Sequence, residues 1–195
     1  MIRYFLVVFI AFYAPVLAIY FDFIPFVFRF HLLVSIAFAL GVYAASRGMT
    51  LRQFGFRSDN LRISMCLNAL LSLVVCTGIL WVHQTDLVRV LDTPDLWSFG
   101  FFYVFVSCPA QEFSCRGFLF ADMKHAGIRS SFMQIAISSV TYAFLHIIYQ
   151  DWITLFGTLI IGIAWSTIYL KHPNMWGVIF SHSVIGLISL SAGLI

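Results

Sequence analysis

Apolar residues form seven long stretches along the chain, separated by short polar segments. The stretches cover residues 2–21, 30–46, 62–82, 97–120, 131–149, 152–170 and 175–194. A helix needs about 20 predominantly apolar residues to cross the hydrocarbon core of a bilayer, and each stretch is close to that length. No strand-type alternation of apolar and polar residues is visible, and only helices and closed barrels satisfy their backbone in lipid. The pattern therefore predicts an all-α, polytopic transmembrane helical bundle of about seven spans.

The composition agrees with this interpretation. Hydrophobic residues make up 62% of the 195 residues, charged residues make up 10%, and the mean hydropathy is +0.97. A soluble domain of this length needs far more polar surface. Arg3 precedes a long apolar run without a small-residue cleavage motif, which indicates a retained anchor. We expect one membrane domain over 1–195, with three preceding spans in 1–96 and a core in 97–195, and no nucleic-acid partner.

The distribution of charge predicts the orientation of the spans. Segment 47–61 is rich in arginine, whereas segment 83–96 carries three aspartates and one arginine. Cytoplasmic loops hold the excess of Lys and Arg, so 47–61 is predicted to be cytoplasmic and 83–96 to lie on the other side. Alternation then places the N-terminus in the cytoplasm and the C-terminus outside. We expect an integral protein of a bacterial inner (cytoplasmic) membrane.

Glu112 is the only glutamate in the chain, and it lies inside the fourth apolar stretch. Arg116 follows one helical turn later, where a guanidinium can pair with a carboxylate. An ionisable group at the bilayer centre costs at least about 2.5 kcal/mol, so two of them mark a functional site unless they form a structural ion pair. Pro109 removes a backbone hydrogen bond just before Glu112 and is predicted to distort the helix there.

Four of the six histidines lie at span ends or in loops, namely His31, His83, His125 and His172, whereas His146 and His182 lie inside apolar stretches. A lone histidine in a span usually bonds a neighbouring helix. Together with Glu112 and Arg116, however, these two place an acid, a base and a cation on three different spans. A carboxylate and an imidazole can hold and deprotonate a water molecule, and a second imidazole can stabilise the oxyanion that forms when this water attacks an amide.

Other chemistries remain open for the same residues. Glu112 and the two histidines could bind zinc with Cys108 or Cys115 as a further ligand, but HExxH is absent and a nearby arginine disfavours a cation. Cys115 could form a nucleophilic pair with a histidine. Glu and His inside spans also serve proton-coupled carriers, although the chain lacks the internal repeats that many carriers have. We expect no metal and no cofactor.

Three short motifs, in this order and on three spans, carry a resemblance to a known family. The motifs are Gln111-Glu112-Phe-Ser-Cys-Arg116, Tyr142-Ala-Phe-Leu-His146 and His182-Ser-Val-Ile-Gly186. They resemble the Glu-Glu-x-x-x-Arg, Phe-x-x-x-His and His-x-x-x-Asn motifs of the CAAX protease and bacteriocin-processing family of intramembrane endopeptidases. The resemblance covers about residues 97–194.

The resemblance implies a glutamic-type, metal-independent endopeptidase. Its substrate would be a membrane-embedded or lipid-anchored protein or peptide, cleaved in C-terminal processing, sorting-signal removal or bacteriocin-type maturation. By position, Glu112 and His146 would activate water, His182 would support the oxyanion, and Arg116 would orient the acid. Tyr142 and Ser183 would face the substrate.

Two positions depart from the family pattern. Gln111 replaces the first acid of the pair and cannot take up a proton. Either Glu112 acts alone, or the chain is a natural pseudoenzyme, or the residue was changed to disable catalysis. Gly186 replaces the asparagine, so that the Ser183 hydroxyl or a backbone amide would have to donate in its place. These departures favour an alternative function, that of a non-catalytic membrane scaffold or immunity protein.

Overall fold

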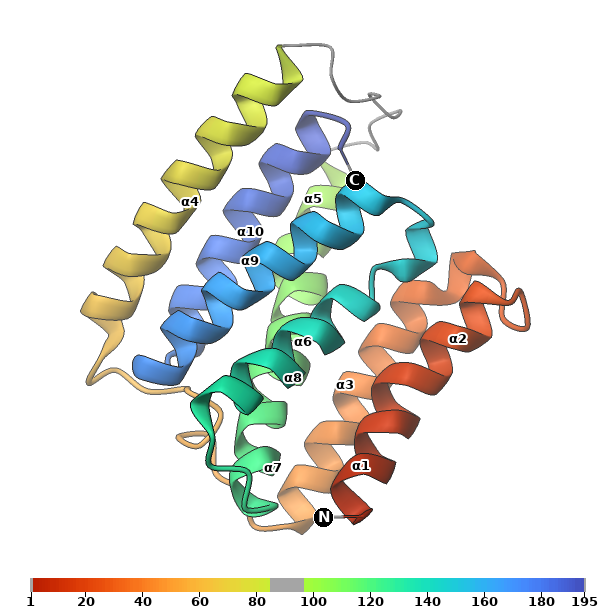
Figure 1. The fold of residues 1–195 in the computed structure, drawn as a ribbon, viewed down its shortest axis with the longest axis vertical. Coiled ribbons are helices and arrows are strands. Elements are labelled where there is room, and N and C mark those ends of the chain that lie inside the picture. Colours follow the sequence, from red (N-terminus) through yellow and green to blue (C-terminus); the bar gives the residue numbers. More distant parts are fainter. Residues whose placement is uncertain (1, 85–96, 195) are drawn as a thin grey trace.

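The computed structural model describes residues 2–84 and 97–194, and these residues form a bundle of helices without strands (Figure 1). The first half of the chain contains α1 (Ile2–Val8), η1 (Phe9–Tyr13), α2 (Ala14–Tyr20), η2 (Phe26–Phe28), α3 (Arg29–Ser46) and α4 (Leu61–His83). The second half contains α5 (Ser98–Phe102), η3 (Tyr103–Ser107), α6 (Cys108–Glu112), η4 (Phe113–Phe118), α7 (Leu119–His125), α8 (Ser131–Phe144), η5 (Ile147–Tyr149), α9 (Trp152–Lys171) and α10 (Met175–Ser191).

Each of the seven predicted stretches is helical over most of its length. Five helical stretches in the described part of the chain are long and apolar enough to cross a membrane, namely Ile2–Tyr20, Phe26–Ser46, Leu61–His83, Ser131–Tyr149 and Trp152–Lys171. The sixth, α10, is apolar but shorter. The seventh is the run from α5 to α7, which carries Glu112 and Arg116. The predicted polytopic helical bundle is therefore confirmed; the acidic residues of segment 83–96 lie outside the described residues.

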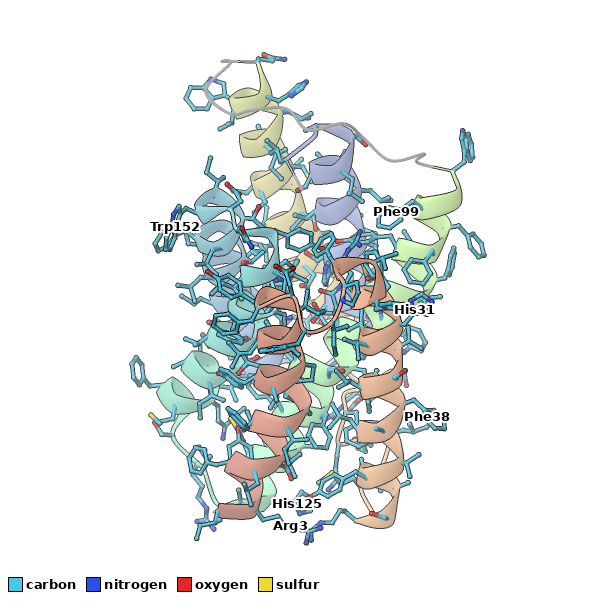
Figure 2. All side chains as sticks on the ribbon, turned by 90° about the vertical axis from the view of Figure 1, so that its right-hand side faces the viewer. Arg3, His31, Phe38, Phe99, His125 and Trp152 are labelled. Atoms are coloured by element: carbon cyan, nitrogen blue, oxygen red, sulfur yellow. The ribbon has the colours of Figure 1, made fainter. Side chains whose placement is uncertain are left out.

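The outer surface of the bundle is apolar, as a lipid-facing surface must be. Large hydrophobic side chains such as Phe9, Phe38 and Ile160 are more than half exposed. Figure 2 shows Phe38 projecting away from α3 and the body of the protein. A soluble monomer rarely exposes apolar patches on this scale. The protein is therefore an integral membrane protein, and its exposed apolar side chains are the surface that meets the acyl chains.

Two proline residues each follow a π-helical segment. Pro15 comes after η1, and Pro109 comes after η3. A proline inside a helix has no N–H and its ring collides with the carbonyl four residues earlier, which here belongs to Ala11 or Phe105. Both carbonyls lie in the π-helical turns, where the wider ladder accommodates the proline. The distortion predicted at Pro109 therefore takes the form of π-helical turns on both sides of α6.

Helices α4 and α10 lie side by side through small and polar residues (Figure 1). The face of α4 that meets α10 carries Ser64, Asn68 and Ser72, all buried. Gly177 of α10 lies directly over this face, and the Ser72 hydroxyl donates to Ser181 Oγ at 2.9 Å. Small residues let two backbones approach in lipid, where burial of apolar area gives no driving force for helix association. This packing fixes the part of α10 that precedes His182.

Helices α8 and α9 also meet through hydroxyl groups. Ser166 Oγ donates to Ser138 Oγ at 3.0 Å, and Ser138 Oγ donates to the carbonyl oxygen of Cys115 at 2.8 Å. These bonds connect α9, α8 and η4 in one chain of hydrogen bonds. They hold α8, which leads into His146, against η4, which follows Glu112.

Polar side chains cap the helix ends outside the spans. Asp151 caps α9 by accepting from the backbone N–H of Thr154 at 2.6 Å, and the hydrogen bonds from Thr154 lower the pKa of the Asp151 carboxyl. In the loop before α4, hydrogen bonding to Arg57 holds the pKa of the Asp59 carboxyl well below its usual range. Both carboxylates are therefore ionised under physiological conditions.

The close approach at Gly177 yields a stability prediction. A Cβ added at Gly177 would overlap Ser64 Oγ and lie 3.1 Å from Asn68 Nδ2 and 3.2 Å from the backbone carbon of Ser64. We expect Gly177→Ala to lower the free energy of unfolding by about 1–3 kcal/mol, as overpacking does. The measurement is the thermal unfolding midpoint of the purified protein in detergent. Gly157→Ala is the matched control, because nothing lies within 4 Å of its added Cβ, and it should leave the midpoint unchanged or higher. Equal midpoints for the two variants would contradict the packing described.

Candidate functional site

Glu112 lies at the centre of a buried polar cluster inside the bundle. Its side chain has no exposed surface, and one carboxylate oxygen, Oε1, accepts two hydrogen bonds. Arg116 Nη1 donates to it at 3.0 Å, and His182 Nδ1 donates to it at 2.6 Å. The predicted pairing of Glu112 with Arg116 is therefore confirmed. The structure adds His182 from α10 to the same carboxylate, so that three of the predicted site residues form one cluster.

Arg116 is fully buried and is stabilised by more than the carboxylate. Its guanidinium carbon lies 4.2 Å from the ring centroid of Tyr142 and 5.2 Å from that of Trp165. Two of its nitrogens, Nε and Nη2, have no hydrogen-bond partner among the described residues. Aromatic faces attract a desolvated cation and partly replace the missing hydrogen bonds. The charge balance of the cluster therefore depends on Glu112.

His182 is held on both of its ring nitrogens. Nδ1 bonds Glu112, and Nε2 lies 3.4 Å from the Tyr142 hydroxyl. Trp165 stacks on the imidazole, with ring centroids 4.9 Å apart and planes 26° apart, and the indole N–H donates to Ser181 at 2.9 Å. Trp165 thus contacts both His182 and Ser181, the residue before it. The imidazole has one orientation, set by α6, α8 and α9 together.

Tyr142 connects the two histidines that the sequence singled out. Its hydroxyl meets His182, and its backbone carbonyl oxygen lies 2.9 Å from His146 Nδ1. A carbonyl only accepts, so Nδ1 of His146 carries the proton, and Nε2 of the neutral ring keeps its lone pair. His146 lies one helical turn after Tyr142, where α8 has just ended and η5 begins. A continuous path therefore runs from Glu112 through His182 and Tyr142 to His146.

A cavity of about 130 Å³ lies beside this cluster. Its walls are mostly apolar and come from η1 and α2, from α3, from the run between α5 and η4, and from the segment that follows α8. The polar residues that line it are Arg29, Tyr103, Ser107, Gln111, Ser114, His146 and Tyr149. The first two spans thus form one part of the cavity wall, and the later spans form the rest.

The structure divides the predicted site residues into two groups. Gln111 and His146 line the cavity, and Gln111 Nε2 donates to Ser107 Oγ at 3.0 Å. The remaining predicted residues are buried and do not line it; they are Glu112, Arg116, Tyr142, His182 and Ser183. Neighbouring residues of a helix point about 100° apart. Gln111 therefore faces the cavity, whereas Glu112 faces the buried cluster.

The geometry offers little to a metal ion. Within residues 2–84 and 97–194, no three His, Cys, Asp or Glu side chains lie close enough together to hold one. The cation of Arg116 occupies the side of Glu112 where a metal would compete with it. Cys108 packs with Tyr103 and Leu190 as a small apolar residue.

Several residues of the site were not predicted from the sequence. Trp165 lies in the middle of an apolar stretch and looks like any packing residue there. Ser107 and Ser114 stand four residues before and three residues after Gln111, which places all three on one helical face. That spacing could have been recognised. Tyr103, which also lines the cavity, could not, because its position depends on the helix opposite.

Comparison with known proteins agrees with the motifs. Residues 93–188 match the family model described as type II CAAX prenyl endopeptidase Rce1-like. The matched region contains all three motifs. No curated protein and no solved structure gives a significant match to the chain.

The buried cluster predicts strong energetic coupling between Glu112 and Arg116. Glu112→Gln leaves a buried guanidinium without its counter-charge, and Arg116→Gln leaves a buried carboxylate. Each change is expected to cost about 3–5 kcal/mol of unfolding free energy. The double variant removes both charges and is expected to cost less than the sum of the two. Chemical unfolding in mixed micelles measures all three.

The exposed pair of Arg52 and Asp59, 3.0 Å apart, is the control. Solvent screens such a pair, so the same cycle there should give almost no coupling. If the cycle at Glu112 and Arg116 were additive, the pair would not be the stabilising unit of the site.

Proposed function

Because residues 93–188 belong to the Rce1-like family of type II CAAX prenyl endopeptidases, we propose that the protein is an intramembrane endopeptidase that hydrolyses an amide bond of a membrane-associated protein or peptide. One observation carries the proposal beyond the family. His146 lines a cavity within the bundle, and its bond to the Tyr142 carbonyl leaves Nε2 of the neutral ring as a proton acceptor. A base beside an enclosed space is what water-dependent hydrolysis requires.

The walls of the cavity favour an apolar substrate. Phe12, Val16, Leu33 and Ile36 from the first two spans contribute to the apolar side, and Gln111 with its partner Ser107 contributes polar groups. A peptide segment with apolar side chains, or a lipid-modified C-terminal tail such as the family name describes, would bury these groups against the walls and bring its backbone to Gln111. C-terminal processing, removal of a sorting signal and maturation of a bacteriocin-type peptide all fit this class. In this proposal the spans of 1–96 complete the site of the core in 97–195.

The proposed reaction begins with water between His146 and Gln111. The amide oxygen of Gln111 accepts a hydrogen bond from the water, and His146 Nε2 takes its proton as the oxygen attacks the scissile carbonyl carbon. The carbonyl oxygen becomes an oxyanion in the tetrahedral intermediate. When the C–N bond breaks, the imidazolium of His146 returns the proton to the leaving amine.

Glu112, Arg116 and His182 support this step from behind the cavity. Glu112 compensates Arg116 and orients His182, and His182 meets the hydroxyl of the tyrosine whose carbonyl orients His146. Because Glu112 compensates the charge of Arg116, it limits the repulsion between that guanidinium and the imidazolium that forms on His146. We assign Tyr142 to the same support, and we keep Ser183, whose hydroxyl is buried without a partner, as a group able to rearrange when substrate binds.

We also propose the orientation predicted from the sequence. Figure 2 shows Arg3 and His125 at the same end of the bundle. In Figure 1 the C-terminal ends of α3 and α7 lie at the end that holds the N-terminus; Arg47 directly follows α3, and Lys124 lies in the last turn of α7. This end is the cytoplasmic one under the positive-inside rule, which places the C-terminus outside a cytoplasmic membrane.

Gln111 favours a second candidate function. Of the described residues that line the cavity, none is Asp or Glu, so we assign the acid–base capacity there to His146. A non-catalytic scaffold or immunity protein of the same family would keep the buried cluster for stability and lose the cavity chemistry. The two functions differ in what a change at His146 does.

The first functional prediction concerns His146. The purified protein in liposomes is mixed with fluorogenic peptides that carry an apolar or farnesylated C-terminal segment. His146→Gln removes the proton acceptor and is expected to reduce the cleavage rate by about 10²–10⁴-fold, with the protein still folded. His172→Gln, in the turn after α9, is the matched control and should cleave like the original protein. Unchanged cleavage in His146→Gln would contradict the role of His146 as the base, whereas no cleavage by the original protein together with an unchanged cellular phenotype in His146→Gln would favour the scaffold.

The second functional prediction concerns Gln111. Gln111→Glu supplies a carboxylate at the cavity and is expected to raise the cleavage rate by about 10-fold or more, since an acid can share the proton transfer with His146. The comparison is made with and without a chelator, and both rates should ignore it. A rate that falls on chelation, or a Gln111→Glu variant slower than the original protein, would contradict the proposed mechanism.

A further inference from the structure

Gly186 has an unusual neighbour for a residue in the middle of a helix. It lies in α10, one helical turn after His182, and a Cβ built on it would overlap the hydroxyl and ring carbons of Tyr103. The phenol of Tyr103 therefore occupies the space that any side chain at position 186 would enter. Only a glycine allows η3 and α10 to meet in this way.

Tyr103 also faces the cavity. Tyr103 packs with Cys108 and Leu190 and is almost fully buried. It also lines the cavity, together with Gln111 and His146. The ring meets the imidazole of His182 edge to face, with centroids 5.9 Å apart and an interplanar angle of 76°. The phenol thus stands between the buried cluster and the enclosed space. The hydroxyl itself lies against Gly186 beside this wall, and a phenol O–H is a hydrogen-bond donor.

Two other candidate donors are engaged, whereas the Ser114 hydroxyl, which also lines the cavity, has no partner among the described residues. His182 uses both ring nitrogens inside the protein, and Gln111 gives its amide N–H to Ser107. Gly186 has no side chain to donate. We propose that the Tyr103 hydroxyl is the oxyanion donor of this site and takes the place of the missing side chain at position 186. This inference rests on the proposed endopeptidase function and adds a catalytic residue to it.

The chemistry of the step is simple. As water attacks the scissile carbonyl, negative charge develops on the carbonyl oxygen, and the Tyr103 O–H donates a hydrogen bond to that oxygen without transferring its proton. The bond is lost again when the tetrahedral intermediate collapses and the C–N bond breaks. Loss of one oxyanion donor typically lowers kcat by about 10²–10³-fold.

Tyr103→Phe tests the proposal, because it removes one oxygen and preserves the ring that packs against Gly186. We expect kcat to fall by about 10²-fold or more with little change in KM and in the thermal midpoint, because the hydrogen bond strengthens only in the transition state. Tyr4→Phe is the control, since Tyr4 is buried, its hydroxyl has no partner, and it does not line this cavity. It should cleave at the original rate.

A reciprocal exchange provides the second arm. Gly186→Asn alone places a side chain into the phenol and is expected to lower the thermal midpoint. Tyr103→Ala combined with Gly186→Asn opens the space and puts an amide donor into it, so we expect at least about 10-fold more cleavage than Tyr103→Ala alone. A combined variant no faster than Tyr103→Ala would show that the space does not hold the oxyanion donor.

Every variant is made both in the original chain and in a chain that carries Gln111→Glu. Whichever of these two parent chains cleaves the peptides serves as the reference. If neither cleaves any peptide, the proposed function fails and the assignment of Tyr103 falls with it. If a reference cleaves and Tyr103→Phe cleaves as fast, the endopeptidase stands and Tyr103 is only a packing residue. If Ser114→Ala in place of Tyr103→Phe causes the loss of kcat, the donor is the hydroxyl of Ser114 and the proposal is wrong.

Discussion

A carboxylate and a guanidinium that share the interior of a membrane protein constrain everything around them. Glu112 and Arg116 have no exposed surface, and neither charge could remain there alone. The structure responds with a third partner, His182, and with two aromatic faces over the guanidinium. The continuous helix formed by α6 and η4 thereby meets α8, α9 and α10 at one point. The mutual orientation of the later spans follows from satisfying this pair.

The proline before the pair sets which side chains face the cavity. The wider turns of η3 and η4 on either side of α6 change the register of the helix around Pro109. Gln111 then points to the cavity while Glu112 points to His182. The two neighbours cannot exchange these roles without a rotation of α6. An acid at position 111 would be open to water and substrate, whereas the acid at position 112 is held for structure and electrostatics.

Much of the fold could be predicted because lipid permits few solutions. The apolar stretches had to be helices, and the buried Glu112 and Arg116 had to pair at four-residue spacing. The partition of the site could not be predicted, since it depends on which face of each span meets which neighbour. His146 and His182 looked equivalent in the sequence. Only the packing of Trp165 against one of them and the carbonyl of Tyr142 beside the other assigns one to the cluster and one to the cavity.

The first two spans show why a core motif is not a complete site. The family match begins at residue 93, yet Phe12, Val16 and Leu33 form a wall of the cavity that holds His146. Their side chains carry no chemistry, and any apolar residues of similar size would satisfy a motif search equally well. In the proposed function they would decide how much water reaches His146 and which apolar groups of a substrate fit. The proposed catalytic residues, fixed by hydrogen bonds, could then remain in place while the enclosing spans change, and substrate preference would reside in the walls that the motifs do not describe.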